Sequence, residues 1–284
     1  MSAVSRVLQS ADDRISKRNF EKLSEYIYNY SGIKMPAAKI TMLEGRLRRR
    51  LRATGHSSFD DYCHFLFQQG GLESEAIYLI DAVTTNKTDF FREPNHFAFM
   101  KNQALPELVG NGVYDIRAWS AACSIGAEPY TMAMVMDDFI DGRSGLSYGI
   151  VATDLSTEVL DVARRGIYTA DMVVPVPTPL RNRYVMPALD ATRREVRIVP
   201  GLRARVGFGR MNLMDPAYPI RSKMHLIFCR NVLIYFDKKT QTGVLQRLCD
   251  CLEKGGFLFI GHSESITGID LPLRQVGNTV FQRL

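Results

Sequence analysis

The sequence has no apolar run that approaches the roughly 20 residues a helix needs to cross a bilayer. Its first residues, Met1–Arg6, also lack the apolar core of a secretory signal peptide. These two absences argue against membrane insertion and secretion. We therefore expect a cytoplasmic protein.

Cysteine is scarce and follows no ligand pattern. The chain has five cysteines, an odd number, and they are scattered. Cys249 and Cys251 stand two apart in a predicted helix, so their side chains point to different sides and lack the partners of a zinc site. The pattern favours reduced structural thiols, and we expect no bound metal.

What the chain does contain is typical of a globular protein. Hydrophobic residues make up 46% and charged residues 23% of the 284 residues, which suits one large domain or two smaller ones. The net charge of +6 is unevenly spread, because residues 14–52 hold 11 Lys and Arg against 3 Asp and Glu, a net charge of +8. Such a basic segment indicates an acidic partner: nucleic acid, a membrane or an acidic protein face.

Residues from about 15 to 82 carry apolar side chains at helical spacing. The two clearest stripes are Phe20, Leu23, Ile27 and Tyr30, and then Ile40, Leu43, Leu47 and Leu51. The other side of the second helix holds five arginines: Arg46, Arg48, Arg49 and Arg52, with Arg50 at the border. We predict a small all-α N-terminal domain over residues 1–88.

From about residue 115, apolar β-like runs alternate with helical stretches, which is typical of a parallel α/β sheet. The predicted strands span residues 115–119, 148–153, 205–211, 224–228 and 257–260. The helix before the last strand is predicted to bury Val244, Leu245, Leu248 and Leu252, and residues 273–284 to form a hairpin. Prolines and short alternating runs indicate an antiparallel β insertion at about 180–207. These patterns thus predict that residues 89–284 form an α/β domain with a parallel sheet and a small β insertion.

The loop after the first predicted strand lacks a dinucleotide fingerprint, since it has one glycine, Gly126, where G-x-G-x-x-G needs three. Glu128 stands just inside the next helix, where a carboxylate would repel a pyrophosphate and favour a cation. S-adenosylmethionine suits this loop, because it has no phosphate and carries a sulfonium and an ammonium group. The alternative is that Glu128 only complements the helix dipole.

Two further polar residues follow predicted strands. Asp154 could accept both hydroxyls of a ribose, or it could cap the helix that begins near Ser156. The apolar run before Asp154 favours the ribose role. Asn212 beside Leu213 suits the edge and face of an adenine, although such a pair is also common at a plain strand end.

The segment after the fourth strand contains Asn231, which could bond the cofactor, and Tyr235, which could place a phenol at the methyl-transfer centre. It lacks the [D/N/S]-P-P-[Y/F] string of many nitrogen methyltransferases, which argues against nitrogen as the methyl acceptor. Upstream, Asn86, Thr88 and Arg92 lie in a turn-like stretch. This stretch could close over a ligand at the edge of the sheet, or it could be only a linker.

Six strings carry a resemblance to a known family: TTNKTDFFRE, SAACSIGAEPY, VATDLSTEVL, MNLMD, IFCRNVLIYFD and GGFLFIGHSE. Over essentially its whole length the chain resembles the chemotaxis receptor glutamate O-methyltransferases, the CheR family. The resemblance implies a helical domain joined to a Rossmann-like, S-adenosyl-L-methionine-dependent methyltransferase domain with a small antiparallel β-subdomain. It also implies methylation of glutamate side chains on the cytoplasmic helices of methyl-accepting chemotaxis receptors, with S-adenosyl-L-homocysteine as product.

The resemblance further implies roles for single residues. Arg92 and Tyr235 would position the reacting groups as catalytic residues. The cofactor site would be lined by Asn86, Thr88, Arg92, Glu128, Asp154, Asn212, Leu213, Asn231 and Val232. An ionised glutamate nucleophile needs no general base, and His262 is accordingly interpreted as structural.

The basic helix face is predicted to recognise the acidic side of the receptor helices, with a solvated face as the alternative. Its members are Arg46, Arg48, Arg49, Arg50 and Arg52. Reversing Arg46 and Arg49 to Glu should then weaken receptor binding and spare S-adenosylmethionine binding.

The sequence departs from the family in the β insertion. Residues 187–194 contain no glycine, whereas members that dock on a receptor's C-terminal peptide have a glycine-rich loop there. This difference argues against a peptide tether. We expect a monomer without nucleic-acid binding. The rival functions are a nucleic-acid methyltransferase, suggested by the basic segment, and a non-enzymatic S-adenosylmethionine-binding scaffold.

Overall fold

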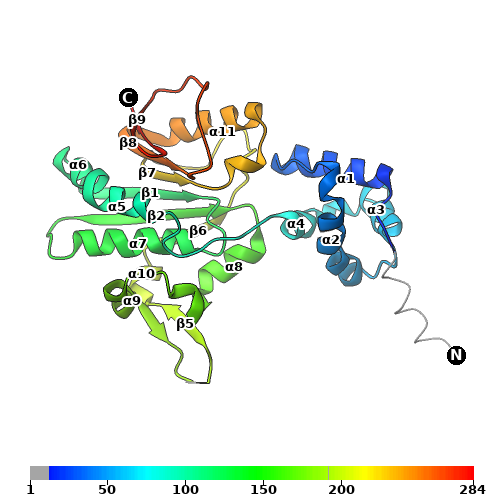
Figure 1. Ribbon diagram of the computed structural model, residues 1–284, viewed down its shortest axis with the longest axis horizontal. Coiled ribbons are helices and arrows are strands. Elements are labelled where there is room, and N and C mark those ends of the chain that lie inside the picture. Colours follow the sequence, from blue (N-terminus) through cyan, green and yellow to red (C-terminus); the bar gives the residue numbers. More distant parts are fainter. Residues whose placement is uncertain (1–12, 191) are drawn as a thin grey trace. The chain divides into compact units, whose positions relative to one another are not determined.

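The structure is a computed structural model that describes residues 13–190 and 192–284. The chain divides into two compact units, one up to Thr85 and one from Asn86 to Leu284 (Figure 1). The first is all helical, and the second is built on a mixed sheet. Within the described residues, no helix is long and apolar enough to cross a membrane.

Over its described residues, from Asp13 onward, the helical unit contains four α-helices and one short 3-10 turn. They are α1 (Lys17–Ser31), η1 (Ala37–Lys39), α2 (Ile40–Thr54), α3 (Phe59–Gln68) and α4 (Leu72–Val83). Ser16 and Ser58 cap α1 and α3 by accepting backbone N–H bonds, and Gly32 and Gly55 end α1 and α2 in the left-handed conformation. Both predicted stripes face the core, where Leu23, Ile27, Leu43 and Leu47 are fully buried.

A seven-stranded sheet forms the second unit, in the order β6-β2-β1-β7-β8-β10-β9. The strands are β1 (Asp115–Ala121), β2 (Ser147–Asp154), β6 (Val206–Arg210), β7 (Met224–Cys229), β8 (Leu252–Ile260), β9 (Leu273–Gly277) and β10 (Val280–Arg283). The first five in the sheet order are parallel, and the last two form the predicted antiparallel hairpin. The chain moves outward from β1 to β2 and β6 and then returns to β7, so the strand order reverses between β1 and β7. Open α/β sheets bind ligands at such a reversal, outside the carboxyl ends of the strands.

Helices cover both faces of this sheet (Figure 1). They are α5 (Pro94–Phe99), the π-helix η2 (Met100–Ala104), α6 (Leu105–Gly110), α7 (Ala127–Ile140), α8 (Thr157–Arg165), α10 (Pro200–Arg203), η4 (Leu233–Tyr235) and α11 (Lys238–Cys251). Successive strand residues serve opposite cores: Ala118 packs in the core that contains α7, and Trp119 in the core that contains α11. Leu252 is buried with the other three predicted residues, but its assignment to the helix was wrong, because α11 ends at Cys251 and Leu252 begins β8.

The β insertion is a separate antiparallel sheet in the order β3-β5-β4. Its elements are β3 (Ile167–Thr169), η3 (Ala170–Val173), α9 (Thr178–Tyr184), β4 (Val185–Pro187) and β5 (Glu195–Ile198). The strands β4 and β5 lie within the predicted insertion at about 180–207. The third, β3, is only three residues long and lies before the predicted insertion, directly after Gly166.

The cysteines behave as the sequence predicts. All five are free, and four of them are buried: Cys63, Cys123, Cys229 and Cys249. Burial raises the pKa of the Cys63 thiol to about 12 and that of Cys249 to about 11. These thiols therefore stay protonated at neutral pH and pack as small apolar groups.

Candidate active site

Polar groups gather at the carboxyl ends of β1, β2 and β7. The loop after β1 places Ala122 and Ser124 in the left-handed region, with φ of 63° and 51°, followed by Gly126 at 91°. A Cβ on Gly126 would lie 2.9 Å from the Ala163 Cβ, so this position requires glycine for conformation and for space. The tight turn brings the start of α7 against the end of β1.

Glu128 is buried in the first turn of α7, at 9% exposure. Its Oε1 accepts a hydrogen bond of 2.7 Å from Ser120 Oγ, and its Oε2 accepts one of 2.8 Å from Arg230 Nε. The partner of this carboxylate is therefore a buried guanidinium as well as a helix N-terminus. Each carboxylate oxygen has a second lone pair and can accept a further donor.

Asp154 ends β2 and binds two backbone N–H groups. Its Oδ2 accepts from Ser124 N at 2.8 Å and its Oδ1 from Ser156 N at 2.9 Å. The N-cap residue of α8 is Ser156, so Asp154 does not hold the capping position of the alternative interpretation. Ser124 Oγ donates to the Asn86 carbonyl at 2.8 Å, which brings Asn86 to the same place.

Arg92 stands between two non-glycine residues in the left-handed conformation, Phe91 with φ of 54° and Glu93 with φ of 57°. Such conformations cost on the order of 1–3 kcal/mol each and persist where the surroundings hold them. Phe91 N donates to Thr131 Oγ1 at 3.2 Å, and the Arg92 carbonyl accepts from Arg230 Nη2 at 2.7 Å. Backbone strain of this kind clusters at functional sites.

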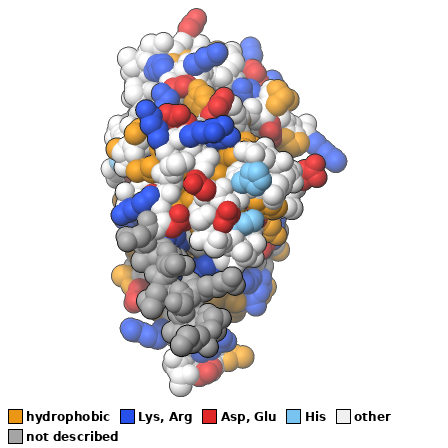
Figure 2. Space-filling view, turned by 90° about the vertical axis from the view of Figure 1, so that its right-hand side faces the viewer, with side chains coloured by type: hydrophobic (Ala, Val, Ile, Leu, Met, Phe, Trp, Pro, Cys, Tyr) orange, Lys and Arg blue, Asp and Glu red, His pale blue; other side chains and the backbone are white. Residues whose placement is uncertain are grey.

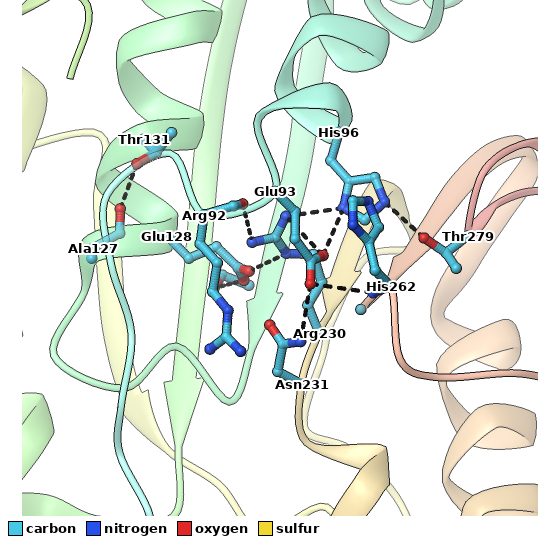
Figure 3. A network of polar contacts seen from close by, with 12 residues as sticks. Arg92, Glu93, His96, Ala127, Glu128, Thr131, Arg230, Asn231, His262 and Thr279 are labelled. Carbon is cyan, nitrogen blue, oxygen red and sulfur yellow. Dashed lines mark hydrogen bonds and ion pairs between the residues drawn. The ribbon is translucent and has the colours of Figure 1, made fainter. Parts of the chain in front are cut away.

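Glu93 links this segment to the residues after β7 and β8 (Figure 3). Its Oε1 accepts from Asn231 Nδ2 at 3.1 Å and from His262 N at 3.2 Å. Burial by itself would raise the pKa of Glu93, but these two bonds and the Arg230 charge hold that pKa below its ordinary value. Glu93 is therefore ionised at neutral pH.

Glu93, His96 and His262 bring potential metal-ligand atoms within 4.8 Å of one another. Arg230 Nη1 lies 2.9 Å from His96 Nδ1 and 3.7 Å from Glu93 Oε2. A metal ion placed among these atoms would face the guanidinium charge at short range. The arrangement therefore favours a hydrogen-bond network over a metal centre.

The segment after β7 is shaped by a buried carboxylate, that of Glu264. It accepts backbone N–H bonds from Gly261 at 2.6 Å, Asn231 at 2.9 Å and Ile234 at 3.3 Å. Burial raises the pKa of Glu264, and the backbone donors oppose that rise. A Cβ on Gly261 would lie 2.5 Å from Asn231 Nδ2, so only glycine at this position leaves room for the Asn231 side chain. Asn231 itself is in the left-handed conformation, with φ of 57°. Tyr235, half-buried in η4, ends this segment.

The remaining predicted residues of this unit lie on neighbouring loops. Asn212 folds back on its own turn, where its Oδ1 accepts from Met214 N at 3.0 Å, and Leu213 is buried beside it. The side chain of Arg92 donates to the Lys87 carbonyl at 3.1 Å. Thr88 and Val232 are half-buried. Ser124 thus connects Asn86 with Asp154, and Arg230 connects Arg92 with Glu128. Asn231 joins the same network through Glu93, which pairs with Arg230.

The five arginines of α2 belong to the helical unit, and three of them bind groups within it. Arg46 donates to the Val83 and Thr84 carbonyls at the end of α4. Arg48 donates to the Asp13 carbonyl at 3.0 Å. Arg50 forms a two-pronged ion pair of 2.7 and 2.8 Å with buried Glu75.

Arg49 and Arg52 are the exposed members of the five. Arg46, Arg48 and Arg50 are half-buried by the contacts given above, and receptor recognition by the five arginines stays a prediction. Figure 2 shows one face of the molecule, on which Lys and Arg side chains are interspersed with Asp and Glu.

Sequence reasoning missed four residues of the site: Glu93, His96, Arg230 and Glu264. Arg230 and Glu264 stand inside strings that were singled out for other residues. A charged residue directly after a run of apolar strand residues such as 226–229 is a signal for a buried ion pair, and it could have identified Arg230. His96 carries no such signal, because its partners are far away in the sequence.

Fold and site together define a class of protein. A Rossmann-like sheet without a glycine-rich phosphate loop, with carboxylates at the ends of β1 and β2, fits an S-adenosylmethionine-dependent methyltransferase. The family model described as "CheR methyltransferase, SAM binding domain" matches residues 86–281, and "CheR methyltransferase, all-alpha domain" matches residues 18–84. The chain belongs to the CheR methyltransferase family.

Curated relatives agree with this assignment. A chemotaxis protein methyltransferase of Borreliella burgdorferi is 39% identical, over 89% of this chain and 90% of the relative. Chemotaxis protein methyltransferase 2 of Pseudomonas aeruginosa is 35% identical, over 99% and 98%. That of Escherichia coli K12 is 36% identical, over 94% and 91%.

Proposed function

We propose that the protein transfers the methyl group of S-adenosylmethionine to glutamate carboxylates on the cytoplasmic helices of chemoreceptors, giving methyl esters. The observation that carries the proposal is family membership over both units, with relatives named chemotaxis protein methyltransferases. The missing nitrogen-methylation string supports an oxygen acceptor.

The residues at the carboxyl edge of the sheet fit the cofactor by the chemistry of their donors and acceptors. Glu128 would accept from the ammonium group, and Asp154 from the ribose hydroxyls, because both retain acceptor capacity beside their protein partners. When bound, S-adenosylmethionine supplies an electrophilic methyl group. The other lining residues would be Asn86, Thr88, Arg92, Asn212, Leu213, Asn231 and Val232.

Positioning of the acceptor is assigned to Arg92 and Tyr235. A free glutamate has a pKa of about 4.3, so it is an ionised nucleophile at neutral pH and needs no base. Arg92 would orient the acceptor carboxylate without neutralising it fully, and Tyr235, on η4, would place its phenol at the methyl-transfer centre. Correct orientation alone lowers such barriers by up to ~7–11 kcal/mol in favourable cases.

Receptor recognition is assigned to the exposed arginines of α2, Arg49 and Arg52. Their charges face solvent, where they can meet the acidic residues of receptor helices. Arg46, Arg48 and Arg50 support this face by fixing α2 to the rest of the helical unit.

Transfer of a tritiated methyl group to a chemoreceptor cytoplasmic fragment, followed by mild alkali, tests the proposal. We expect release of volatile methanol, because a carboxyl methyl ester hydrolyses under those conditions. Alkali-stable label would mean a nitrogen acceptor and would overturn it. Tight cofactor binding without any label on the fragment, or on nucleic acid, would favour a scaffold function.

A further inference from the structure

Arg230 is the common hydrogen-bond partner of Glu128, Arg92 and His96 (Figure 3). Its side chain is 2% exposed and donates in three directions. Nε binds Glu128 at 2.8 Å, Nη2 binds the Arg92 carbonyl at 2.7 Å, and Nη1 binds His96 Nδ1 at 2.9 Å. One guanidinium thus joins the start of α7, the strained segment before α5, and α5 itself.

The walls around Arg230 fix its plane. Its Cζ lies 5.2 Å from the Phe97 ring centre and 5.7 Å from that of Phe228, within the range of cation–π attraction. A planar fork held by aromatic rings and by bonds in three directions has little freedom to turn. A lysine would keep the charge and lose the geometry.

His96 holds the third arm as a neutral acceptor. Its Nε2 lies 2.9 Å from Thr279 Oγ1 and 3.2 Å from the Asn278 carbonyl, which assigns the ring proton to Nε2 and leaves Nδ1 to accept from Arg230. Burial, and then the Arg230 charge, lower the pKa of His96 to about 4. The histidine therefore remains an acceptor throughout the neutral range.

We propose that Arg230, oriented by His96, is a positioning residue that sets Glu128 and the Arg92 backbone in the geometry required for cofactor binding and methyl transfer. This inference rests on the proposed function for the roles of Glu128 and Arg92. One buried cation couples Glu128 to the segment around Arg92. A displacement of Arg230 would therefore move the carboxylate that binds the ammonium group together with the segment that orients the acceptor.

A purely structural role for Arg230 predicts a different outcome. If the arginine only stabilised the fold, a variant would lose stability, and its folded molecules would bind and react normally. If it positions both groups, a folded variant binds S-adenosylmethionine more weakly and also turns over more slowly at saturation. The Kd for S-adenosylmethionine and the kcat of the folded variant therefore distinguish the two roles.

The first test uses the full chain with Arg230→Lys. Calorimetric titration with S-adenosylmethionine should show a Kd raised about tenfold, and kcat on the receptor fragment should fall by a similar factor. The matched control is Arg117→Lys, since Arg117 also donates to a backbone carbonyl, that of Lys223, and lies against a histidine, His225, near the amino ends of β1 and β7 and so away from the site. The control should leave Kd and kcat unchanged. A folded Arg230→Lys protein with wild-type Kd and kcat would overturn the inference.

The second test varies His96, in case the arginine variant fails to fold. In His96→Asn, the amide oxygen occupies the place of Nδ1 and should preserve Kd and kcat, whereas His96→Leu offers no acceptor and should reproduce the Arg230→Lys defect. Equal behaviour of the two variants would refute the role of His96. Because Kd is measured without a methyl acceptor, it judges this inference even if the receptor fragment proves not to be the substrate.

Discussion

The arginines of α2 and the arginine that follows β7 are opposites in sequence and in structure. The first are five in seven residues, and the second is the single charged residue of the string IFCRNVLIYF. In the structure, three of the five anchor their own unit, whereas Arg230 has the most connected position in the candidate site. Charge density along a chain therefore indicates little about which cation matters for chemistry. The role of an arginine is decided by the carbonyls and carboxylates that neighbouring elements place within reach of its guanidinium.

The largest loss of stability is expected when the ion pair between Arg50 of α2 and buried Glu75 is broken. Glu75→Ala removes the acceptor of Arg50 and of the Tyr62 hydroxyl, which lies 2.9 Å away. Leaving a buried charge without its partner should lower the free energy of unfolding by about 3 kcal/mol. Urea unfolding followed by circular dichroism measures this loss. Glu73→Ala, on the exposed side of the same helix, is the control, and coincident unfolding curves for the two variants would show that the pair contributes nothing.

A smaller effect, visible only on acidification, is expected around Arg230. The pKa of His96 is about 4 in the folded protein against 6.5 ordinarily, so between these values the unfolded chain binds a proton that the folded chain does not. The contribution of His96 to the free energy of unfolding is therefore fully present above pH 6.5 and is lost as the pH falls toward 4. Between pH 7 and 5 the loss is about 2 kcal/mol.

His96→Asn should lose less stability over that interval, because asparagine does not titrate. The groups that face His96 are Arg230, Glu93 and His262. Glu93 has a lowered pKa and titrates below this window. Parallel pH profiles for the wild-type and variant proteins would contradict the neutral state of His96.

The smallest effect is expected at the exposed arginines. Arg49→Glu combined with Arg52→Glu should raise KM for the receptor fragment about tenfold, more at low salt, without changing kcat or the Kd for S-adenosylmethionine. Arg46→Glu is the contrasting variant, since it sets a carboxylate against the Val83 and Thr84 carbonyls and should reduce stability. If Arg46→Glu is stable and defective only in receptor binding, the division of the arginines drawn above is wrong.

Much of the fold followed from local pattern. The two helical stripes, the five parallel strands and the final hairpin were predicted because each buries side chains at its own period. Leu252 was misplaced because an apolar residue at a helix-to-strand junction satisfies both periods. The strand β3 escaped notice because three residues are too few to show alternation.

The site was predictable only in part, for a physical reason. Asp154 could be singled out because a carboxylate at the end of an apolar strand is conspicuous, and Glu128 because it stands just inside the helix where a phosphate-binding site would exclude a carboxylate. The bond between His96 and Arg230 joins residues 134 positions apart, and that from His96 to Thr279 joins residues 183 apart. Such partners are chosen by the packing of α5 against β7 and the β9–β10 turn, which no window of sequence contains.

The turn between β9 and β10 has a practical consequence. Thr279, with φ of 53°, and the Asn278 carbonyl hold the outer edge of His96, so this turn borders the site although Thr279 lies 183 positions from His96 along the chain. Trimming the chain after Pro272, or fusing a rigid label close to Leu284, would disturb a support of Arg230 without touching any residue that meets the cofactor. Affinity handles for enzymology therefore belong at the other end of the chain.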